Sequence, residues 1–264
     1  MNENLIFIKL GGSLITDKDQ PDTARPRVIH SLMEALQTLR ETRPELQILL
    51  GHGSGSFGHA AAKRHHTQDG VKTSADWLGF AEVAQKAREL NELVTNMAIS
   101  VGMPVIVHRP SALVLAQNHQ IIRWDTAGIK MTLDKGGVPL IYGDAVIDTE
   151  LGGTILSTEE LFVYLAATFK PSAMLISGIE AGVYSDYPAN SEIAVNLSKY
   201  DNLHNLSLRG ASAPDVTGGM LAKVKLLQSA CQANPGMKAY IFSGMEPENF
   251  AKILAGHSIG TKIS

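Results

Sequence analysis

Short apolar runs alternate with longer amphipathic stretches along this chain. The runs are rich in Ile, Leu and Val, as buried strands are, and the stretches between them repeat apolar positions at helical spacing. Strands are expected at 4–10, 46–50, 104–108, 138–143, 173–178 and 239–244, and helices near 27–42, 79–101, 125–136, 158–169, 219–233 and 247–255. Strands separated by helices favour right-handed crossovers, so the pattern predicts an α/β sandwich: a mainly parallel sheet covered on both faces.

Two segments depart from this alternation. Residues 145–157 alternate apolar and polar positions around Gly152-Gly153, which predicts a β-hairpin added to the sheet. Residues 186–215 are rich in Asp, Asn, Ser and Pro and are expected to form an irregular excursion. No fixed-period repeat or low-complexity linker divides the chain, so residues 1–264 are expected to form one domain.

Composition and charge exclude several classes of protein. The 264 residues are 44% hydrophobic, which is enough for a full core without disulfides. A formal charge of -3 without any basic stripe argues against nucleic acid as a partner. The first residues, MNENLIFIKLGGS, show no basic region followed by a long apolar stretch, and the sequence has no apolar run of about 18 residues. A cytoplasmic protein without a membrane span is therefore expected. The only cysteine, Cys231, falls in a helical pattern and is expected to be a packing residue.

Three of the expected strands end in glycine turns. These are KLGGS at 9–13, GHGSGSFGH at 51–59 and YGD at 142–144. Ligands of parallel sheets lie beyond the carboxyl ends of the strands, where glycine lets successive amides converge on an anion. A glycine pair also opens a helix in DVTGGMLAKVK at 215–225. A single glycine turn would be weak evidence, because glycine often merely ends a strand. The three glycine turns and the glycine pair together indicate phosphate binding.

Familiar phosphate motifs do not explain these glycines. Residues 53–58, GSGSFG, fit the dinucleotide pattern G-x-G-x-x-G, but no strand ending in Asp or Glu follows about 20 residues later. A Walker A loop and the HRD loop of protein kinases are also missing from the sequence. Another kind of phosphate site is therefore expected.

The motifs resemble those of the amino acid kinase family and, within it, of the isopentenyl phosphate kinases. The resemblance rests on KLGGS, Lys18, GSGSFGH at 53–59, GDAVID at 143–148, ILSTEE at 155–160, VYSDYP at 183–188 and VTGGMLAK at 216–223. These motifs follow the family's order over nearly the whole chain. KLGGS and the TGG-containing motif are shared across the family, whereas SFGH is specific to members that act on a phosphomonoester.

The resemblance implies a fold and a reaction. The fold would be a three-layer αβα sandwich with an eight-stranded sheet, whose N-terminal half binds the acceptor and whose C-terminal half binds ATP. The reaction would transfer the γ-phosphoryl group of ATP, with Mg²⁺, to isopentenyl phosphate. Relatives are commonly homodimers. Positioned cations and amides suffice for such a transfer, without a covalent nucleophile.

The resemblance also assigns roles to single residues. Lys9 and Lys18 would contact the transferring phosphate, with Lys18 as the transition-state stabiliser. On the acceptor side, His59 would hydrogen-bond the phosphate, since imidazole can donate from either nitrogen; the other reading of His59 is a cap of the following helix. The acceptor cradle comprises Gly53, Ser54, Gly55 and Gly58, and the nucleotide side comprises Lys9, Gly11, Gly12, Ser13, Gly178, Tyr184, Gly219 and Lys223.

An apolar slot is needed for the hydrocarbon tail of the acceptor. The helix after Trp77 places Phe80, Val83, Ala84 and Ala87 on one side, and Gly153, Ile147 and Ile155 of the hairpin are possible walls. A helical apolar stripe is more often core than pocket. Phe80 and Gly153 are assigned to the substrate.

No metal site built by the protein is expected. Asp144 and Asp148 are weak candidates for direct Mg²⁺ ligands. His65 and His66 are adjacent in sequence, which is poor spacing for a metal pair on a helix.

The sequence departs from the family in the turn that meets adenine and ribose. Relatives carry an Asp-rich turn of the TDVDGVY type, whereas this chain reads SGIEAGVY at 177–184, with Gly178 and Ala181 at the aspartate positions. Ser54 also replaces a common glycine. These changes leave open whether the nucleotide contacts and the preference for ATP are kept. Two other functions remain open: a kinase of another phosphate or phosphonate acceptor, as in the fosfomycin kinases, and a nucleotide-binding regulatory module without turnover.

Overall fold

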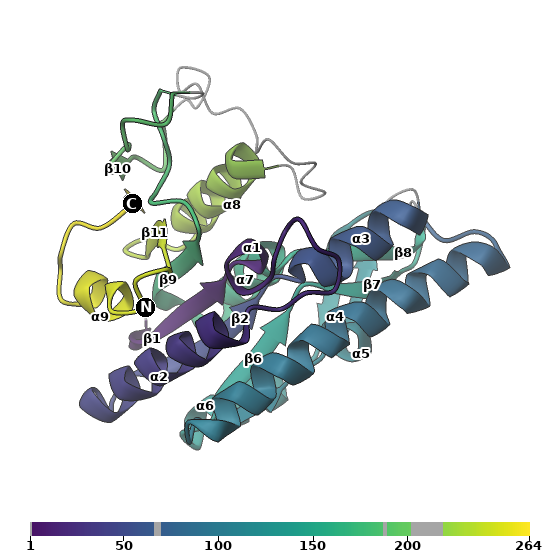
Figure 1. Cartoon of the computed structure of the whole chain (residues 1–264), viewed down its shortest axis with the longest axis horizontal. Coiled ribbons are helices and arrows are strands. Elements are labelled where there is room, and N and C mark those ends of the chain that lie inside the picture. Colours follow the sequence, from purple (N-terminus) through teal and green to yellow (C-terminus); the bar gives the residue numbers. More distant parts are fainter. Residues whose placement is uncertain (1, 66–69, 187–188, 202–218) are drawn as a thin grey trace.

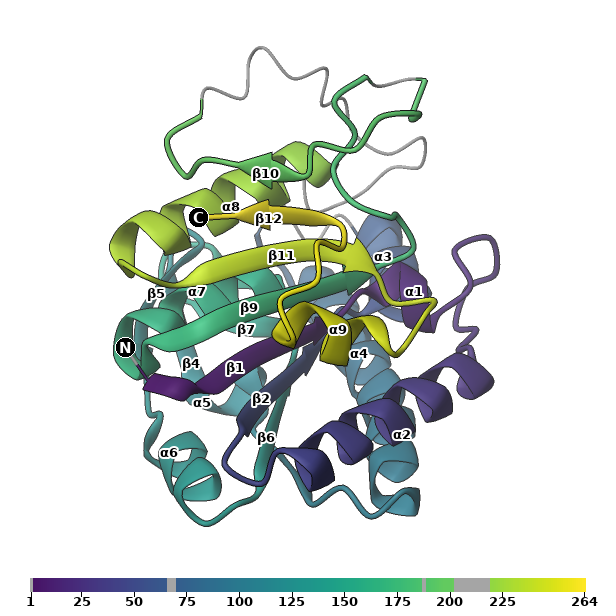
Figure 2. The ribbon, with the colours of Figure 1, turned by 90° about the vertical axis from the view of Figure 1, so that its left-hand side faces the viewer.

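An eight-stranded sheet forms the centre of the molecule (Figure 1). The computed structural model describes residues 2–65, 70–186, 189–201 and 219–264. The strands have the order β10-β12-β11-β9-β1-β2-β6-β3, and Figure 2 shows those from β10 to β6 side by side. Their bounds are β1 Asn2–Leu10, β2 Gln47–His52, β3 Val105–Val107, β6 Val138–Tyr142, β9 Pro171–Gly178, β10 Asn196–Leu197, β11 Lys238–Ser243 and β12 Thr261–Ile263. Among the described strands of this sheet, β11 and β12 are the one antiparallel pair, so β1, β2, β3, β6, β9 and β11 end at one edge of the sheet.

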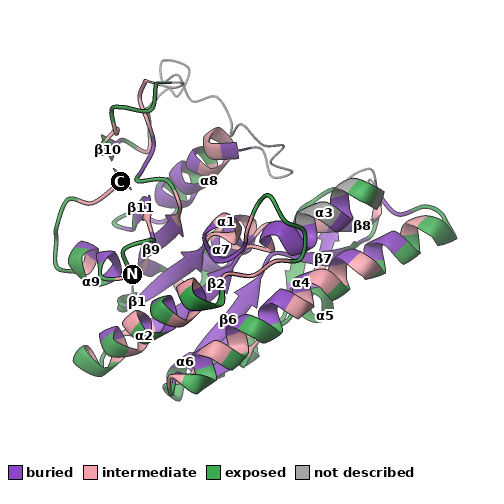
Figure 3. Ribbon diagram, in the orientation of Figure 1, coloured by how far each residue is buried: buried purple, intermediate pink, exposed green. Residues whose placement is uncertain are grey.

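Helices cover both faces of this sheet. They are α1 Gly12–Ile15, α2 Pro26–Thr42, α3 Gly55–His65, α4 Ser74–Ser100, α5 Pro110–Leu113, α6 Ala127–Asp134, α7 Thr158–Phe169, α8 Gly219–Ala233 and α9 Asn249–Leu254. Along β1, Leu5 and Phe7 pack into a core cluster with α7 and α8. The alternate residues Ile6 and Ile8 pack into a second cluster with α2 and α4. Both faces of the strand are buried, which explains its nearly continuous apolar run and confirms the three-layer αβα sandwich (Figure 3).

A second, four-stranded sheet has the order β5-β4-β7-β8. Its strands are β4 Val114–Gln117, β5 Gln120–Trp124, β7 Asp144–Asp148 and β8 Gly152–Leu156. The predicted hairpin is present as β7 and β8, but it belongs to this sheet and is not added to the central one. The β4–β5 hairpin was not predicted from the sequence. The Asp148 carboxylate accepts backbone amides from both turns, at Asn118 and His119 and at Glu150 and Leu151, and so fastens the two hairpins together.

Other elements also differ from the sequence predictions. Helix α4 begins at Ser74, before the expected position, because Thr73 and Asp76 form a capping box. The helix that the alternative reading placed after His59 is present as α3, but it begins at Gly55, so His59 lies inside it and not at its cap position. The edge strands β10 and β12 were not predicted as elements. Of the expected excursion, residues 189–201 contain only β10, and residues 202–215 lie outside the described part.

Two further expectations can be compared with the structure. Cys231 is buried in the core, as expected for a packing residue. A search of the described residues found no helix with the length and apolarity needed to cross a bilayer.

Candidate active site

Two glycine loops meet at the carboxyl edge of the central sheet. The first (residues 11–13) follows β1 and the second (residues 53–55) follows β2. A Cβ atom on Gly12 would lie 2.5 Å from the amide nitrogen of Gly55, and one on Gly53 would lie 2.9 Å from that of Gly12. Side chains would not fit at these two positions. The glycines therefore bring the predicted nucleotide and acceptor loops into direct contact.

Only some of the predicted amide donors are available to a ligand. The Gly11 amide donates to the Ser177 carbonyl at 2.8 Å, and the Gly53 amide donates to the Leu10 carbonyl at 3.0 Å. Both amides complete the backbone bonding of the sheet edge, so the contact of Gly11 and Gly53 with a phosphate stays a prediction. Within the described part of the chain, the amides of Gly12, Ser13, Ser54 and Gly55 donate to no protein acceptor. These four amides remain as candidate anion donors.

Lys9 lies beside the junction of the two loops. Its Cε atom is 3.8 Å from the position that a Cβ on Gly53 would take. The side chain is 9% exposed and forms an ion pair with the buried carboxylate of Glu159. Lys223 Nζ lies 3.9 Å from the other oxygen of the same carboxylate. Burial alone would raise the pKa of Glu159, but the charges of Lys9 and Lys223 outweigh it and lower that pKa. One carboxylate thus holds two of the predicted phosphate-binding lysines together.

Helix α7 supplies Glu159 at its first turn. Ser157 caps the helix in a capping box with Glu160, and the Thr158 hydroxyl donates to the His52 carbonyl at 2.6 Å. A Cβ on Gly51 would overlap Thr158, so the glycine allows α7 to approach β2 closely. Glu159 was not predicted from the sequence as a site residue. The signal that could have found Glu159 is its place in the first turn of a helix, between the capping-box residues Ser157 and Glu160 of the motif ILSTEE.

His52 is a second functional candidate that the sequence analysis did not assign. The His52 ring is fully buried and stacks on the ring of Tyr142. Its Nε2 atom lies 3.0 Å from Asn91 Nδ2. Its Nδ1 lies 3.0 Å from the Gly53 carbonyl, which can only accept a hydrogen bond, so Nδ1 carries the proton. Burial, with a smaller contribution from the Lys9 charge, lowers the pKa of His52 to about 4 despite the bond to Gly53. The ring is therefore neutral and braces the second glycine loop.

Lys18 differs from Lys9 and Lys223 in that its side chain is exposed to solvent. It lies on the loop of residues 17–25, which a backbone bond from Asp17 to Thr23 closes. Lys86 of α4 anchors this loop through Asp22 at 3.1 Å. Among the described residues, Lys18 forms no ion pair or hydrogen bond with another predicted site residue. Its contact with the transferring phosphate stays a prediction.

The remaining nucleotide-side residues lie at the end of β9, after β9 and on α8, in the C-terminal half of the chain. The position of a Cβ on Gly11 is 3.3 Å from Gly178 Cα, so the first glycine loop packs on the end of β9. A Cβ on Gly178 itself would meet nothing nearer than 4.0 Å. Tyr184 pairs with Ile193 after β9, and Gly219 begins α8 one turn before Lys223. Residues 216–218 of the same motif lie outside the described part.

The acceptor-side residues lie where α3, α4 and the second sheet meet. Phe80 packs closely against Gly153: a Cβ atom on Gly153 would lie 2.6 Å from the Phe80 ring. Phe80 and Val83 belong to a small buried apolar cluster with Ala61, Ala62, Val71 and Ala145. At its border, Ile155 is partly buried, whereas Ile147 and Trp77 are exposed. Gly58 lies in the first turns of α3, which also carries His59, but the side chain of His59 lies outside the described part.

The two aspartates considered for Mg²⁺ have other partners. Asp144 accepts the amides of Ser111 and Ala145, and burial raises its pKa. Asp148 fastens the two hairpin turns, as described above. No group of three His, Cys, Asp or Glu side chains among the described residues is arranged to hold a metal. The described side chains therefore do not fit a protein-built Mg²⁺ site.

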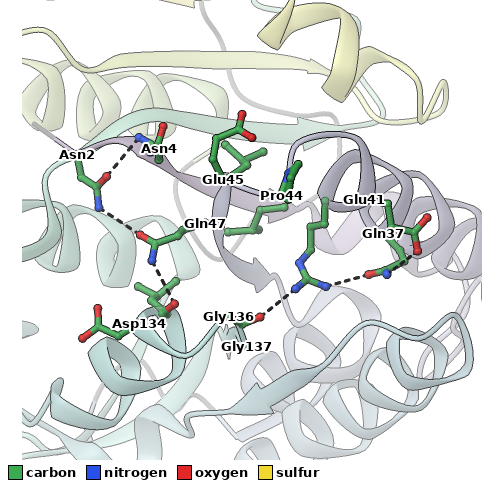
Figure 4. Close-up of a pocket in the computed structure, with 14 residues that line it drawn as sticks. Asn2, Asn4, Gln37, Glu41, Pro44, Glu45, Gln47, Asp134, Gly136 and Gly137 are labelled. Carbon is green, nitrogen blue, oxygen red and sulfur yellow. Dashed lines mark hydrogen bonds between the residues drawn. The ribbon is translucent and has the colours of Figure 1, made fainter.

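A pocket of about 510 Å³ lies at the opposite edge of the sheet, where β1 and β2 begin (Figure 4). Its polar side chains are largely bonded to neighbours: Arg40 donates to the Gly136 carbonyl, and Gln47 to the Leu133 carbonyl. It contains none of the predicted site residues. The glycine loops, not this pocket, are the candidate active site.

Comparison with known proteins shows the family of this chain. The sequence matches the amino acid kinase family over residues 4–243. It is 32% identical to the isopentenyl phosphate kinase of Methanocaldococcus jannaschii, with 98% of each chain covered. A crystal structure of an isopentenyl phosphate kinase has the same fold, with a TM-score of 0.83 at 24% identity, covering 98% of this chain and 100% of that one. The product complex of the T. acidophilum isopentenyl phosphate kinase superposes with a TM-score of 0.80 at 26% identity and the same coverage. The chain belongs to the amino acid kinase family.

Proposed function

We propose that this chain transfers the γ-phosphoryl group of ATP to isopentenyl phosphate, forming isopentenyl diphosphate and ADP. The observation that carries the proposal is the contact between the two glycine loops, with the Lys9–Glu159–Lys223 cluster beside it. Two phosphate groups bound by such loops would lie next to each other and next to two cations. Two relatives that match over 98% of this chain are named isopentenyl phosphate kinase.

In the proposed mechanism, an oxygen of the acceptor phosphate attacks the γ-phosphorus as the bond to the β–γ bridging oxygen breaks. The second pKa of a phosphomonoester is about 6, so this oxygen is ionised near neutral pH and needs no general base. Lys9 and Lys223 would neutralise the phosphates, while the amides of Gly12, Ser13, Ser54 and Gly55 would orient them. Glu159 keeps both ammonium groups at the junction before the substrates arrive. Lys18 and His59 keep the roles that the resemblance implies.

The proposal has four further parts. Mg²⁺ would arrive bound to ATP, because the described aspartates are engaged elsewhere. Residues 1–264 would act as one kinase domain with an acceptor half and an ATP half. A homodimer is supported by the exposed Ile99 and Ile106 at the end of α4 and on edge strand β3. The cytoplasmic location stays a prediction from the sequence.

An acceptor panel tests the function directly. ADP release with MgATP is expected to be fastest with isopentenyl phosphate, slower with dimethylallyl phosphate and negligible with fosfomycin or with no acceptor. Product identity would be checked by ³¹P NMR. Faster turnover of fosfomycin would favour the phosphonate-kinase alternative. Binding of ATP in calorimetry, without turnover of any acceptor, would favour the regulatory module.

His59→Ala tests the proposed phosphate contact. We expect kcat/KM for isopentenyl phosphate to fall about 10- to 100-fold, because the acceptor phosphate loses a hydrogen-bond donor in the transition state. Thermal unfolding should be nearly unchanged. His30→Ala on α2 is the matched control and should keep full activity. An equally active His59→Ala variant would show that the histidine does not recognise the phosphate.

A further inference from the structure

Thr16 joins the two glycine loops through its side chain. It follows α1 directly, and its side chain is fully buried. The hydroxyl donates to the Gly12 carbonyl at 2.7 Å and accepts the Ser56 amide at 3.0 Å. Gly12 belongs to the first glycine loop, and Ser56 directly follows the second. One oxygen atom therefore bridges the predicted nucleotide side and the predicted acceptor side.

The hydrogen-bond roles at this oxygen are fully determined. A hydroxyl has one proton, which goes to the Gly12 carbonyl, so a lone pair must accept the Ser56 amide. Within the described residues, no other hydrogen bond joins residues 12–16 to α3. A valine would keep the shape but leave the Ser56 amide without this acceptor.

Neighbouring residues hold the Thr16 side chain in one position. Gly55 has a φ of +52°, and a Cβ there would collide with the Thr16 side chain. The Ser56 hydroxyl in turn accepts a hydrogen bond from the Thr23 amide at 3.4 Å. This bond links the Thr16–Ser56 contact to the loop that carries Lys18. Figure 1 shows α1 beside the start of α3, above the ends of β1 and β2. The bridge thus connects the three segments that carry the predicted phosphate contacts.

We propose that the Thr16 hydroxyl is a positioning group: it fixes the spacing of the two glycine loops and hence the alignment of the two phosphates during transfer. The inference rests on the proposed function. In-line transfer depends steeply on the separation and direction of the reacting atoms, whereas binding of each substrate depends on its own loop. Loss of the bridge should therefore affect the chemical step more than either binding step.

The test compares Thr16→Val, which removes the hydroxyl at constant volume, with Thr16→Ser, which keeps it. Thr16→Val is expected to lower kcat about 10- to 100-fold while KM for ATP and for isopentenyl phosphate each change less than about threefold. Thr16→Ser should recover kcat to within about threefold. Thr42→Val is the matched control, because the Thr42 hydroxyl also bonds a helix carbonyl but lies at the far end of α2. If Thr16→Val does not fold, Thr16→Ala replaces it with the same expectation.

Three results would overturn the inference: a kcat within twofold of the parent for Thr16→Val, equal losses in the valine and serine variants, or a rise in KM alone. The parent chain in the same assay separates this inference from the proposed function. An inactive parent would overturn both, whereas an active parent beside an unaffected Thr16→Val would overturn only the role of Thr16.

Discussion

Replacement of Lys9 by methionine is expected to lower kcat about 10³-fold. The ammonium lies at the junction of the glycine loops, where the transferring group would develop charge, and loss of one such donor costs about 10²- to 10³-fold in rate. The same change removes a partner of the buried Glu159 carboxylate. We therefore also expect the free energy of unfolding to fall by about 3 kcal/mol. Steady-state kinetics and urea unfolding measure the two effects.

The double variant Lys9→Met/Glu159→Gln separates catalysis from stability. It removes the uncompensated carboxylate, so most of the lost stability should return while kcat stays low. Lys225→Met is the matched control, since Lys225 is an exposed lysine two residues beyond Lys223 on the same helix. A Lys9→Met variant within tenfold of the parent kcat would contradict the proposed contact. Recovery of activity in the double variant would mean that Lys9 acts only by balancing Glu159.

Acidification from pH 7 to pH 4 is expected to remove about 3 kcal/mol of stability through His52 alone. The folded ring has a pKa of about 4 against an ordinary value of 6.5, and each pKa unit corresponds to about 1.36 kcal/mol. Between these values the unfolded chain binds a proton that the folded chain does not. Protonation therefore favours unfolding as the pH falls through this window, and the full stability is present above pH 6.5. Urea unfolding at pH 7, 5.5 and 4.5 measures the slope.

His52→Asn removes the titrating group at this position. Its free energy of unfolding should be lower than that of the parent at pH 7 but should fall less steeply toward pH 4. The exposed residue His257 provides the control, because His257→Asn should follow the parent curve. Parallel curves for the parent and His52→Asn would show that the buried ring does not resist protonation.

Much of the fold could be predicted from local patterns. Both faces of β1, β2, β6, β9 and β11 are buried, so their apolar runs identify them without tertiary information. The β4–β5 hairpin was missed because its strands are short and its turn, Asn118-His119, gains support from Asp148, which lies far along the chain. Residues far apart in sequence decide such a turn, and no local window contains both partners.

Some features of the candidate site could likewise be predicted from the sequence, whereas others required the fold. The sequence by itself determined that glycine turns and lysines follow the strands, and it identified Lys9, Lys18 and Lys223 by motif. Only the tertiary structure decided which amides remain available, since those of Gly11 and Gly53 are used by carbonyls at the sheet edge. It alone showed that Glu159, His52 and Thr16 connect these motifs. A glycine or lysine is recognisable from its neighbours in the chain, but a buried carboxylate, ring or hydroxyl acquires its role from the partners that folding brings within hydrogen-bonding distance.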